Sequence, residues 1–159
     1  MLYPKVFEIV YNSDSKIHLT IHRKSHCDGG LTMFVKGAPE RVLDLCSTIL
    51  IDGCSITLTE QHKIEFWAAY KSISSNGHRV IAFSMCALPG TRFPDNVQFT
   101  SEKKNWPIEN HTFLGLISLD DPPKEGVRDS IIKLRRAGIK VVMITGDHPL
   151  TAEVIIQNS

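Results

Sequence analysis

Long apolar runs are missing from this 159-residue sequence. The longest uncharged one, around residues 113–119, falls far short of the ~18 apolar residues that a membrane-spanning helix needs. The first residues contain Lys5 and Glu8 and no signal-peptide core. An excess of one charge is also missing, because 18 Lys and Arg residues accompany 17 Asp and Glu residues, for a net charge of +1. We therefore expect no membrane span within these residues, no secretion and no nucleic-acid partner.

Paired cysteines are absent as well. The four cysteines, Cys27, Cys46, Cys54 and Cys86, form no C-x-x-C pair, which argues against a zinc ribbon and favours reduced thiols. Three histidines, His18, His22 and His26, recur every four residues, a spacing that could form a metal-binding face on a helix. The surrounding pattern is that of a strand, so solvated histidines are the favoured interpretation and no metal site is predicted.

The N-terminal pattern predicts a β-hairpin. Residues 5–11 and 16–22 are rich in β-branched and aromatic residues, and the turn-forming residues 12–15 separate them. If Tyr11 pairs with Lys16, one face of the hairpin carries residues 7, 9 and 11 together with residues 16, 18 and 20. That face could be a platform for a ligand, or it could be the solvated side of an antiparallel sheet.

The next segments alternate between strands and helices. We expect a strand over residues 31–35, a helix that starts at Pro39, and a second helix capped by Thr59. The apolar residues expected on the buried face of the second helix are Ile64, Trp67, Ala68 and Ile73. A strand over residues 79–88 follows, and then a long polar segment, residues 89–110, that we interpret as an insertion or a mobile loop.

The last third of the sequence changes character. Residues 112–119 and 139–144 are apolar runs typical of strands buried on both faces, and an amphipathic helix closed by Gly138 lies between them. This order predicts a βαβ unit of a parallel sheet. The expected fold is therefore α/β (α+β): a mainly antiparallel sheet with flanking helices over residues 1–120, followed by the first βαβ unit of a doubly wound domain over residues 121–159.

Three groups of residues could bind an anion. Thr145-Gly146-Asp147 follows a predicted strand and precedes a helix, where phosphoryl groups bind in open α/β sheets, although Asp147 could simply cap that helix. Lys36-Gly37 also lies between a strand and a helix, and Arg79 could hold a phosphate bidentately. For Lys36 and Arg79, taken alone, an ordinary exposed residue is the commoner explanation.

Together these motifs indicate a family. The sequences K-G-A-P-E (residues 36–40), D-P-P-K (residues 121–124) and M-I-T-G-D-H-P-L-T-A (residues 143–152) occur in this order, and the chain thereby resembles the P-type cation-transporting ATPases along essentially its whole length. Residues 106–121 and the form G-D-H-P-L-T-A are most similar to the sodium/potassium and proton/potassium pump α-subunits. The resemblance implies part of a nucleotide-binding domain, followed by the start of a haloacid dehalogenase-like phosphorylation domain.

The resemblance also implies roles for individual residues. Tyr11 would stack on adenine where the family pattern has Phe, and His18 stands where a Gln is usual. The other nucleotide-binding residues that it implies are Lys16, Lys36, Gly37, Arg79 and Asp121. Thr145, Gly146 and Asp147 would form the motif that contacts the transferred phosphoryl group, and Lys124 replaces the family's Arg in the D-P-P hinge, which keeps the charge but loses the planar fork.

Two catalytic motifs of the family are missing. The sequence contains no D-K-T-G-T, whose Asp is phosphorylated, and no G-D-G-x-N-D, which helps to hold Mg²⁺. We therefore expect a piece of a longer pump that does not hydrolyse ATP by itself. For the full-length protein the resemblance implies ATP and Mg²⁺, the rest of the pump, possibly a β-subunit, and a place on the cytoplasmic face of a membrane, expected to be the plasma membrane.

Two alternatives stay open. The chain could be a stand-alone nucleotide-binding or regulatory module without catalytic activity. It could also be a soluble haloacid dehalogenase-like phosphatase, although such an enzyme needs a D-x-D nucleophile motif that the sequence lacks.

Overall fold

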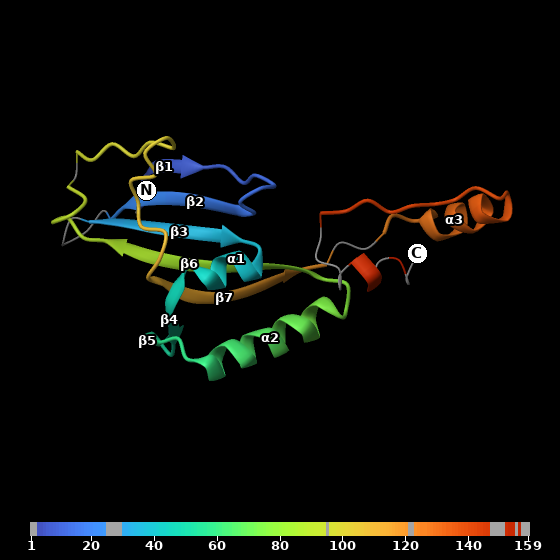
Figure 1. Ribbon diagram of the computed structural model, residues 1–159, viewed down its shortest axis with the longest axis horizontal. Coiled ribbons are helices and arrows are strands. Elements are labelled where there is room, and N and C mark those ends of the chain that lie inside the picture. Colours follow the sequence, from blue (N-terminus) through green and yellow to red (C-terminus); the bar gives the residue numbers. More distant parts are fainter. Residues whose placement is uncertain are drawn as a thin grey trace. The chain divides into compact units, whose positions relative to one another are not determined.

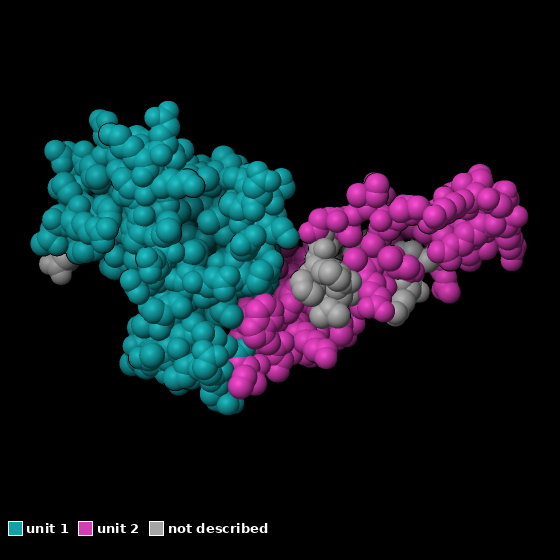
Figure 2. Space-filling view, viewed as in Figure 1, with its two compact units in different colours: residues 1–63, 81–117 teal, residues 64–80, 118–159 magenta. Residues whose placement is uncertain are grey.

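A computed structural model describes residues 3–24, 30–94, 96–120, 123–146, 152–154 and 156. The chain divides into two compact units, residues 1–63 with 81–117 and residues 64–80 with 118–159 (Figure 2). Among the described residues, none of the helices has the length and apolar character needed to cross a bilayer.

The first unit is built on a seven-stranded sheet (Figure 1). Its strand order is β1-β2-β3-β6-β7-β4-β5. The strands are β1 (Lys5–Ile9), β2 (Ile17–Arg23), β3 (Leu31–Gly37), β4 (Cys46–Ile51), β5 (Cys54–Thr57), β6 (Arg79–Leu88) and β7 (His111–Leu119). The β1–β2, β2–β3, β3–β6 and β4–β5 pairs are antiparallel, whereas β4 and β7 are parallel. The expected mainly antiparallel sheet with helices is thus confirmed.

The N-terminal hairpin forms, but its register differs from the one predicted. Ile9 pairs with Leu19 and Glu8 with Thr20, so the strands are shifted by one residue from a pairing of Tyr11 with Lys16. The cause is Lys16, whose φ of 55° lies in the left-handed region and cannot continue a strand. A shift of one residue exchanges the two faces of a strand. The expected platform of residues 7, 9 and 11 beside residues 16, 18 and 20 is therefore wrong.

The core of the first unit lies on one face of the sheet. Alternating residues of β2 and β3 are almost fully buried there: Leu19, Ile21, Leu31, Met33 and Val35. The helix α1 (Pro39–Asp44) begins at the predicted Pro39 and buries Val42 and Leu43. Apolar residues at every second strand position thus supply the hydrophobic stabilisation of this unit.

The long segment after β6 is attached to the sheet by aromatic rings. Phe93 and Trp106 are buried, and Phe7 of β1 lies 5.3 Å from Trp106 and 5.8 Å from Phe99 between ring centroids. The expectation of an insertion or mobile loop overlooked this anchoring, because three aromatic residues spread over a polar segment give no periodic signal.

Helix α2 (Glu60–Ser74) starts as the sequence predicts but buries other residues. The Thr59 hydroxyl accepts a hydrogen bond from the His62 amide at 3.3 Å, which confirms the cap. The buried residues are Phe66, Tyr70 and Ser74, whereas Ile64 and Trp67 are exposed. The expected buried face is therefore wrong, because the inward stripe consists of residues at i, i+4 and i+8 that start from Phe66.

Residues 123–146 correct the expected βαβ unit. Helix α3 (Val127–Arg136) forms, and Gly138, with a φ of 75°, follows its end as predicted. Residues 139–144 do not form a strand, and Ile144 is 95% exposed. A strand needs a neighbour for its backbone groups, and no strand among the described residues runs beside this segment. The boundary expected at Asp121 lies outside the described residues and stays a prediction.

Candidate functional site

The face of the sheet opposite the core carries polar and aromatic side chains in rows. His18 of β2, Lys36 of β3 and Phe83 of β6 are direct cross-strand neighbours. Thr20 and Phe34 form the next row. Side chains directly opposite on adjacent strands lie within about 5.5 Å of one another at their Cβ atoms, so three strands bring an imidazole, an ammonium group and an aromatic ring together.

A cavity of about 240 Å³ lies over these rows. It is lined by His18, Thr20, Phe34, Val35, Lys36, Phe83, Ser84 and Leu114. Its volume is slightly below the ~300–1,000 Å³ typical of small-molecule sites. A mainly apolar wall with two aromatic residues and a few basic or hydroxyl groups suits a planar aromatic ring beside an anion.

Gly37 has a structural reason to be glycine. A Cβ at this position would lie 2.3 Å from the Lys16 carbonyl oxygen, closer than real Cβ contacts allow. The same oxygen accepts a hydrogen bond from the Ala38 amide at 3.0 Å. Gly37 therefore lets the start of β2 lie against the end of β3, which places the backbone of Lys16 beside the residue that follows Lys36.

The loop that carries Tyr11 is ordered by Asn12. The Asn12 side-chain oxygen accepts hydrogen bonds from the Ser15 amide at 2.8 Å and the Asp14 amide at 3.1 Å. Such a side-chain turn holds the loop in a fixed conformation. Tyr11 itself is 58% exposed. Tyr11 and Lys16 are not among the residues that line the cavity, and their contact with a nucleotide stays a prediction.

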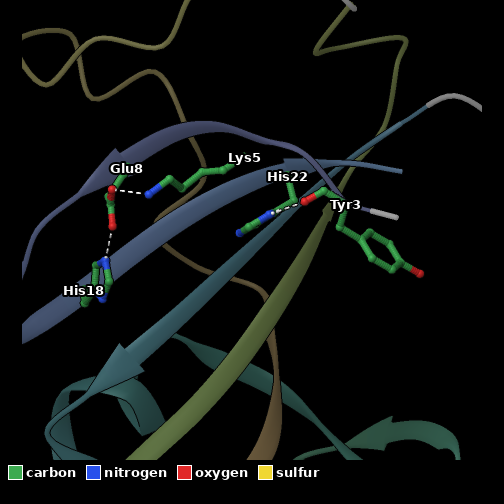
Figure 3. Close-up of polar contacts among 5 residues, drawn as sticks. All are labelled: Tyr3, Lys5, Glu8, His18 and His22. Atoms are coloured by element: carbon green, nitrogen blue, oxygen red, sulfur yellow. Dashed lines mark hydrogen bonds and ion pairs between the residues drawn. The ribbon is translucent and has the colours of Figure 1, made fainter. Parts of the chain in front are cut away.

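Glu8 of the edge strand β1 contacts His18, one of the residues that line the cavity. Its carboxylate accepts a hydrogen bond from His18 Nε2 at 2.8 Å and forms an ion pair with Lys5 (Figure 3). The hydrogen bond from Lys5, and then that from His18, hold the pKa of the Glu8 carboxyl below its usual value. The carboxylate is therefore ionised at neutral pH, and it fixes one edge of the His18 ring.

A buried polar group links β6 and β7 below this face. Ser84 Oγ lies 3.1 Å from His111 Nδ1, and both residues are fully buried. Burial lowers the pKa of His111, although a hydrogen bond to the Pro107 carbonyl opposes the shift. The nearby thiol of Cys46 donates to the Val42 carbonyl at 3.1 Å, and burial raises its pKa to about 12. These groups are neutral at pH 7 and connect the strands rather than act on a ligand.

The structure brings together some of the predicted site residues. His18 and Lys36 line the cavity, and Gly37 follows directly. Arg79 is exposed and belongs to the second unit, so its role at the cavity stays a prediction. Thr145 and Gly146 are exposed in the segment after α3 and do not follow a strand there. Asp121 and Asp147 lie outside the described residues.

Several lining residues were not predicted. Phe34 could have been found, because it lies two positions before Lys36 and strand alternation puts both on one face. Phe83 and Leu114 could not, since they reach the cavity through the pairing of strands distant in sequence. His26 lies outside the described residues, and the described ones include no group of three potential metal ligands.

Comparison with known proteins gives a consistent result. A family described as "P-type ATPase, cytoplasmic domain N" matches residues 2–126. The sodium/potassium-transporting ATPase subunit alpha of Tetronarce californica is 45% identical over 152 residues, which is 96% of this chain and 15% of that protein. The alpha-2 subunits of Rattus norvegicus and Homo sapiens are 44% identical over the same shares of both chains. The chain therefore spans about 15% of the length of these curated relatives.

Proposed function

This chain belongs to the family of P-type cation ATPases, and from that membership we propose that it binds ATP for a pump that couples ATP hydrolysis to ion transport. The cavity over β2, β3 and β6 is the observation that carries the proposal. It offers Phe34 and Phe83 to a base, and Lys36 to an anion. The relatives are named as sodium/potassium-transporting ATPases, which supports sodium and potassium as the ions that the full-length protein exchanges.

The cavity fits one part of the nucleotide best. At about 240 Å³ it has room for a planar base and not for a whole nucleoside triphosphate. The base would lie against the aromatic side chains, and the phosphates would extend toward the cations. In this arrangement Lys36 holds a phosphate by a charge-assisted hydrogen bond, and Gly37 keeps Lys16 close to the same end of the sheet.

The remaining roles complete the proposal. Tyr11 would cover the base from its ordered loop, and Arg79 would clamp a phosphate. Thr145, Gly146 and Asp147 would contact the transferred phosphoryl group in the full-length pump. A Mg²⁺ ion would come with the triphosphate, and no described residue is assigned to it. A β-subunit and a plasma-membrane location, with this segment on the cytoplasmic side, belong to the same proposal.

The 159-residue chain should bind ATP without hydrolysing it. Phosphoryl transfer needs a nucleophile, a metal and correct positioning together, and the sequence contains no D-K-T-G-T nucleophile motif. An acid-stable aspartyl phosphate formed by this chain with ATP would contradict the proposal that it is inactive alone.

The test of ATP binding is a titration followed by NMR on the wild type and on Lys36→Ala. Loss of a charge-assisted hydrogen bond should weaken binding by about ten- to a hundredfold. Lys103→Ala is the matched control, because Lys103 is exposed in the segment after β6 and does not line the cavity. Equal affinities for the wild type and Lys36→Ala, or shift changes away from β2, β3 and β6, would overturn the site.

A further inference from the structure

Phe34, an aromatic wall of the cavity, is contacted by the ring of His22. Phe34 lies on β3 and His22 on β2, and their ring centroids are 5.7 Å apart with an angle of 70° between the two planes. Rings at this distance and angle meet edge to face, an arrangement that stabilises an aromatic pair beyond the area that it buries. Phe34 lines the cavity and His22 does not. His22 therefore restrains a cavity residue without itself reaching the ligand.

The ring of His22 is held in turn by the residues before and in β1. Its Nδ1 lies 3.0 Å from the Tyr3 carbonyl oxygen (Figure 3). A carbonyl oxygen only accepts, so Nδ1 carries the hydrogen of this contact whether the imidazole is neutral or charged. The next carbonyl, that of Pro4, accepts a hydrogen bond from the Arg23 amide at 2.9 Å, and Lys5 is the cross-strand neighbour of His22. The orientation of the His22 ring is therefore fixed in either charge state.

Resting on the proposed nucleotide site, we propose that His22 is the positioning residue of Phe34 and thereby strengthens the binding of the base. A base that docks against Phe34 needs the phenyl ring in one orientation. A side chain that is free to rotate must be ordered when the ligand binds, and this ordering lowers the affinity. The contact from His22 orders the ring beforehand. Phe34 touches the ligand, whereas His22 acts through Phe34.

The effect of His22 is confined to the part of the ligand that carries the base. Lys36, proposed to hold a phosphate, lies two positions after Phe34 on β3, and its cross-strand neighbour on β2 is His18. His22 pairs instead with Thr32, two positions before Phe34. A change at His22 should therefore weaken the binding of a nucleotide and leave the binding of tripolyphosphate, which has no base, unchanged.

The experiment is a double-mutant cycle on the 159-residue chain, with ATP and tripolyphosphate as the two probes. His22→Leu should weaken ATP binding by about two- to tenfold, the range that one edge-to-face ring contact supports. In the Phe34→Leu background the same substitution should not change ATP binding, because the ring through which His22 acts is gone. Tripolyphosphate should bind the wild type and His22→Leu with equal affinity.

Two further variants separate the ring contact from a general structural role. His22→Phe keeps an aromatic ring beside Phe34 and should bind ATP within about twofold of the wild type. Tyr3→Ala is the matched control, because it keeps the backbone carbonyl that His22 contacts. The ring that it removes is 51% exposed and points away from His22 (Figure 3). Tyr3→Ala should follow the wild type with both probes.

The outcomes distinguish the inference from the proposed function. Unchanged ATP affinity in His22→Leu overturns the inference. An equal loss in the Phe34→Leu background, in His22→Phe, in Tyr3→Ala or for tripolyphosphate also overturns it, because each would assign the loss to something other than the contact with Phe34. ATP binding stays in place in all of these cases. Absence of saturable ATP binding by the wild type overturns the proposed function, and the inference with it.

Discussion

At the residue scale, Cys46 and Cys54 differ in burial, and we expect them to differ in reactivity for that reason. Cys46 is half-buried, and burial raises its pKa to about 12 from an ordinary 9.0, whereas Cys54 on β5 is exposed. The thiolate is the reactive form, and the raised pKa of Cys46 lowers its thiolate population at neutral pH. We expect maleimide to label Cys54 faster than Cys46 when the sites are resolved by peptide mass spectrometry. Equal labelling rates in the folded chain would contradict the burial of Cys46.

The lowered pKa of His111 predicts how the free energy of unfolding changes in acid. Burial lowers its pKa below the ordinary 6.5, so in the folded chain it stays neutral where the unfolded chain already binds a proton. Its contribution is present above pH 6.5 and is lost as pH falls below 6.5 toward the lowered folded value.

Urea unfolding of the wild type and His111→Gln at several pH values tests this. The variant should be less stable at neutral pH, because Ser84 loses its buried partner. It should also show a smaller decrease in stability on acidification, since the group that gains a proton on unfolding is gone. The same acid dependence in both proteins would assign the effect to other groups.

At the element scale, the approach of β2 to β3 depends on Gly37. A Cβ there would meet the Lys16 carbonyl oxygen at 2.3 Å, and backbone cannot move aside as a side chain can. We expect Gly37→Ala to cost about 1–3 kcal/mol, as overpacking does. It should also weaken ATP binding, because the strand ends that carry Lys36 and His18 must separate.

Gly30→Ala is the matched control for that substitution. Gly30 lies just before the same strand, and a Cβ there meets no atom within 4 Å. Its effect on the free energy of unfolding should stay within about 0.5 kcal/mol. Urea midpoints and ATP titrations of both variants test this prediction. Similar results for the two would show that the close approach at Gly37 affects neither stability nor ATP binding.

The hairpin shows how far sequence can predict an element. Alternation of apolar residues located both strands, and the turn residues located the loop between them. The register was missed because it depends on the φ of Lys16, and a lysine in the left-handed region gives no signal in the sequence. That single angle decides whether Phe7 or Glu8 shares a face with His18.

The residues of the candidate site were likewise predicted only in part. Lys36 and His18 were predicted because they lie in motifs that can be read locally or by resemblance. Phe83 and Leu114 were missed because they come from strands far away in the chain, and long-range pairing leaves no trace in a single sequence. Glu8 was missed for a further reason: its importance comes from the register of β1 against β2, which the sequence left open.

At the scale of the whole molecule, the sequence pattern predicts the structure of one unit better than that of the other. The first unit contains the seven-stranded sheet, and the apolar residues of β2 and β3 are buried on one face of it as alternation predicts. The second contains α3, on which no residue is buried, and the apolar residues 139–144, which form no strand. An apolar run predicts a buried strand only if neighbouring strands are present to pair with it. In this part of the chain the local sequence pattern predicts a strand, but the structure provides no neighbouring strand among the described residues.

The difference between the predicted strand and the exposed segment gives the last prediction. Ile144 is 95% exposed, so Ile144→Asn should change the free energy of unfolding of the 159-residue chain by no more than about 0.5 kcal/mol. Phe66→Asn in the same unit replaces a ring that is 7% exposed and should cost about 3–5 kcal/mol, because a buried ring that contacts Trp67 and Tyr70 is lost. Urea unfolding followed by circular dichroism compares the two. A loss of several kcal/mol in Ile144→Asn would mean that residues 139–144 pack as the buried strand that their sequence predicts.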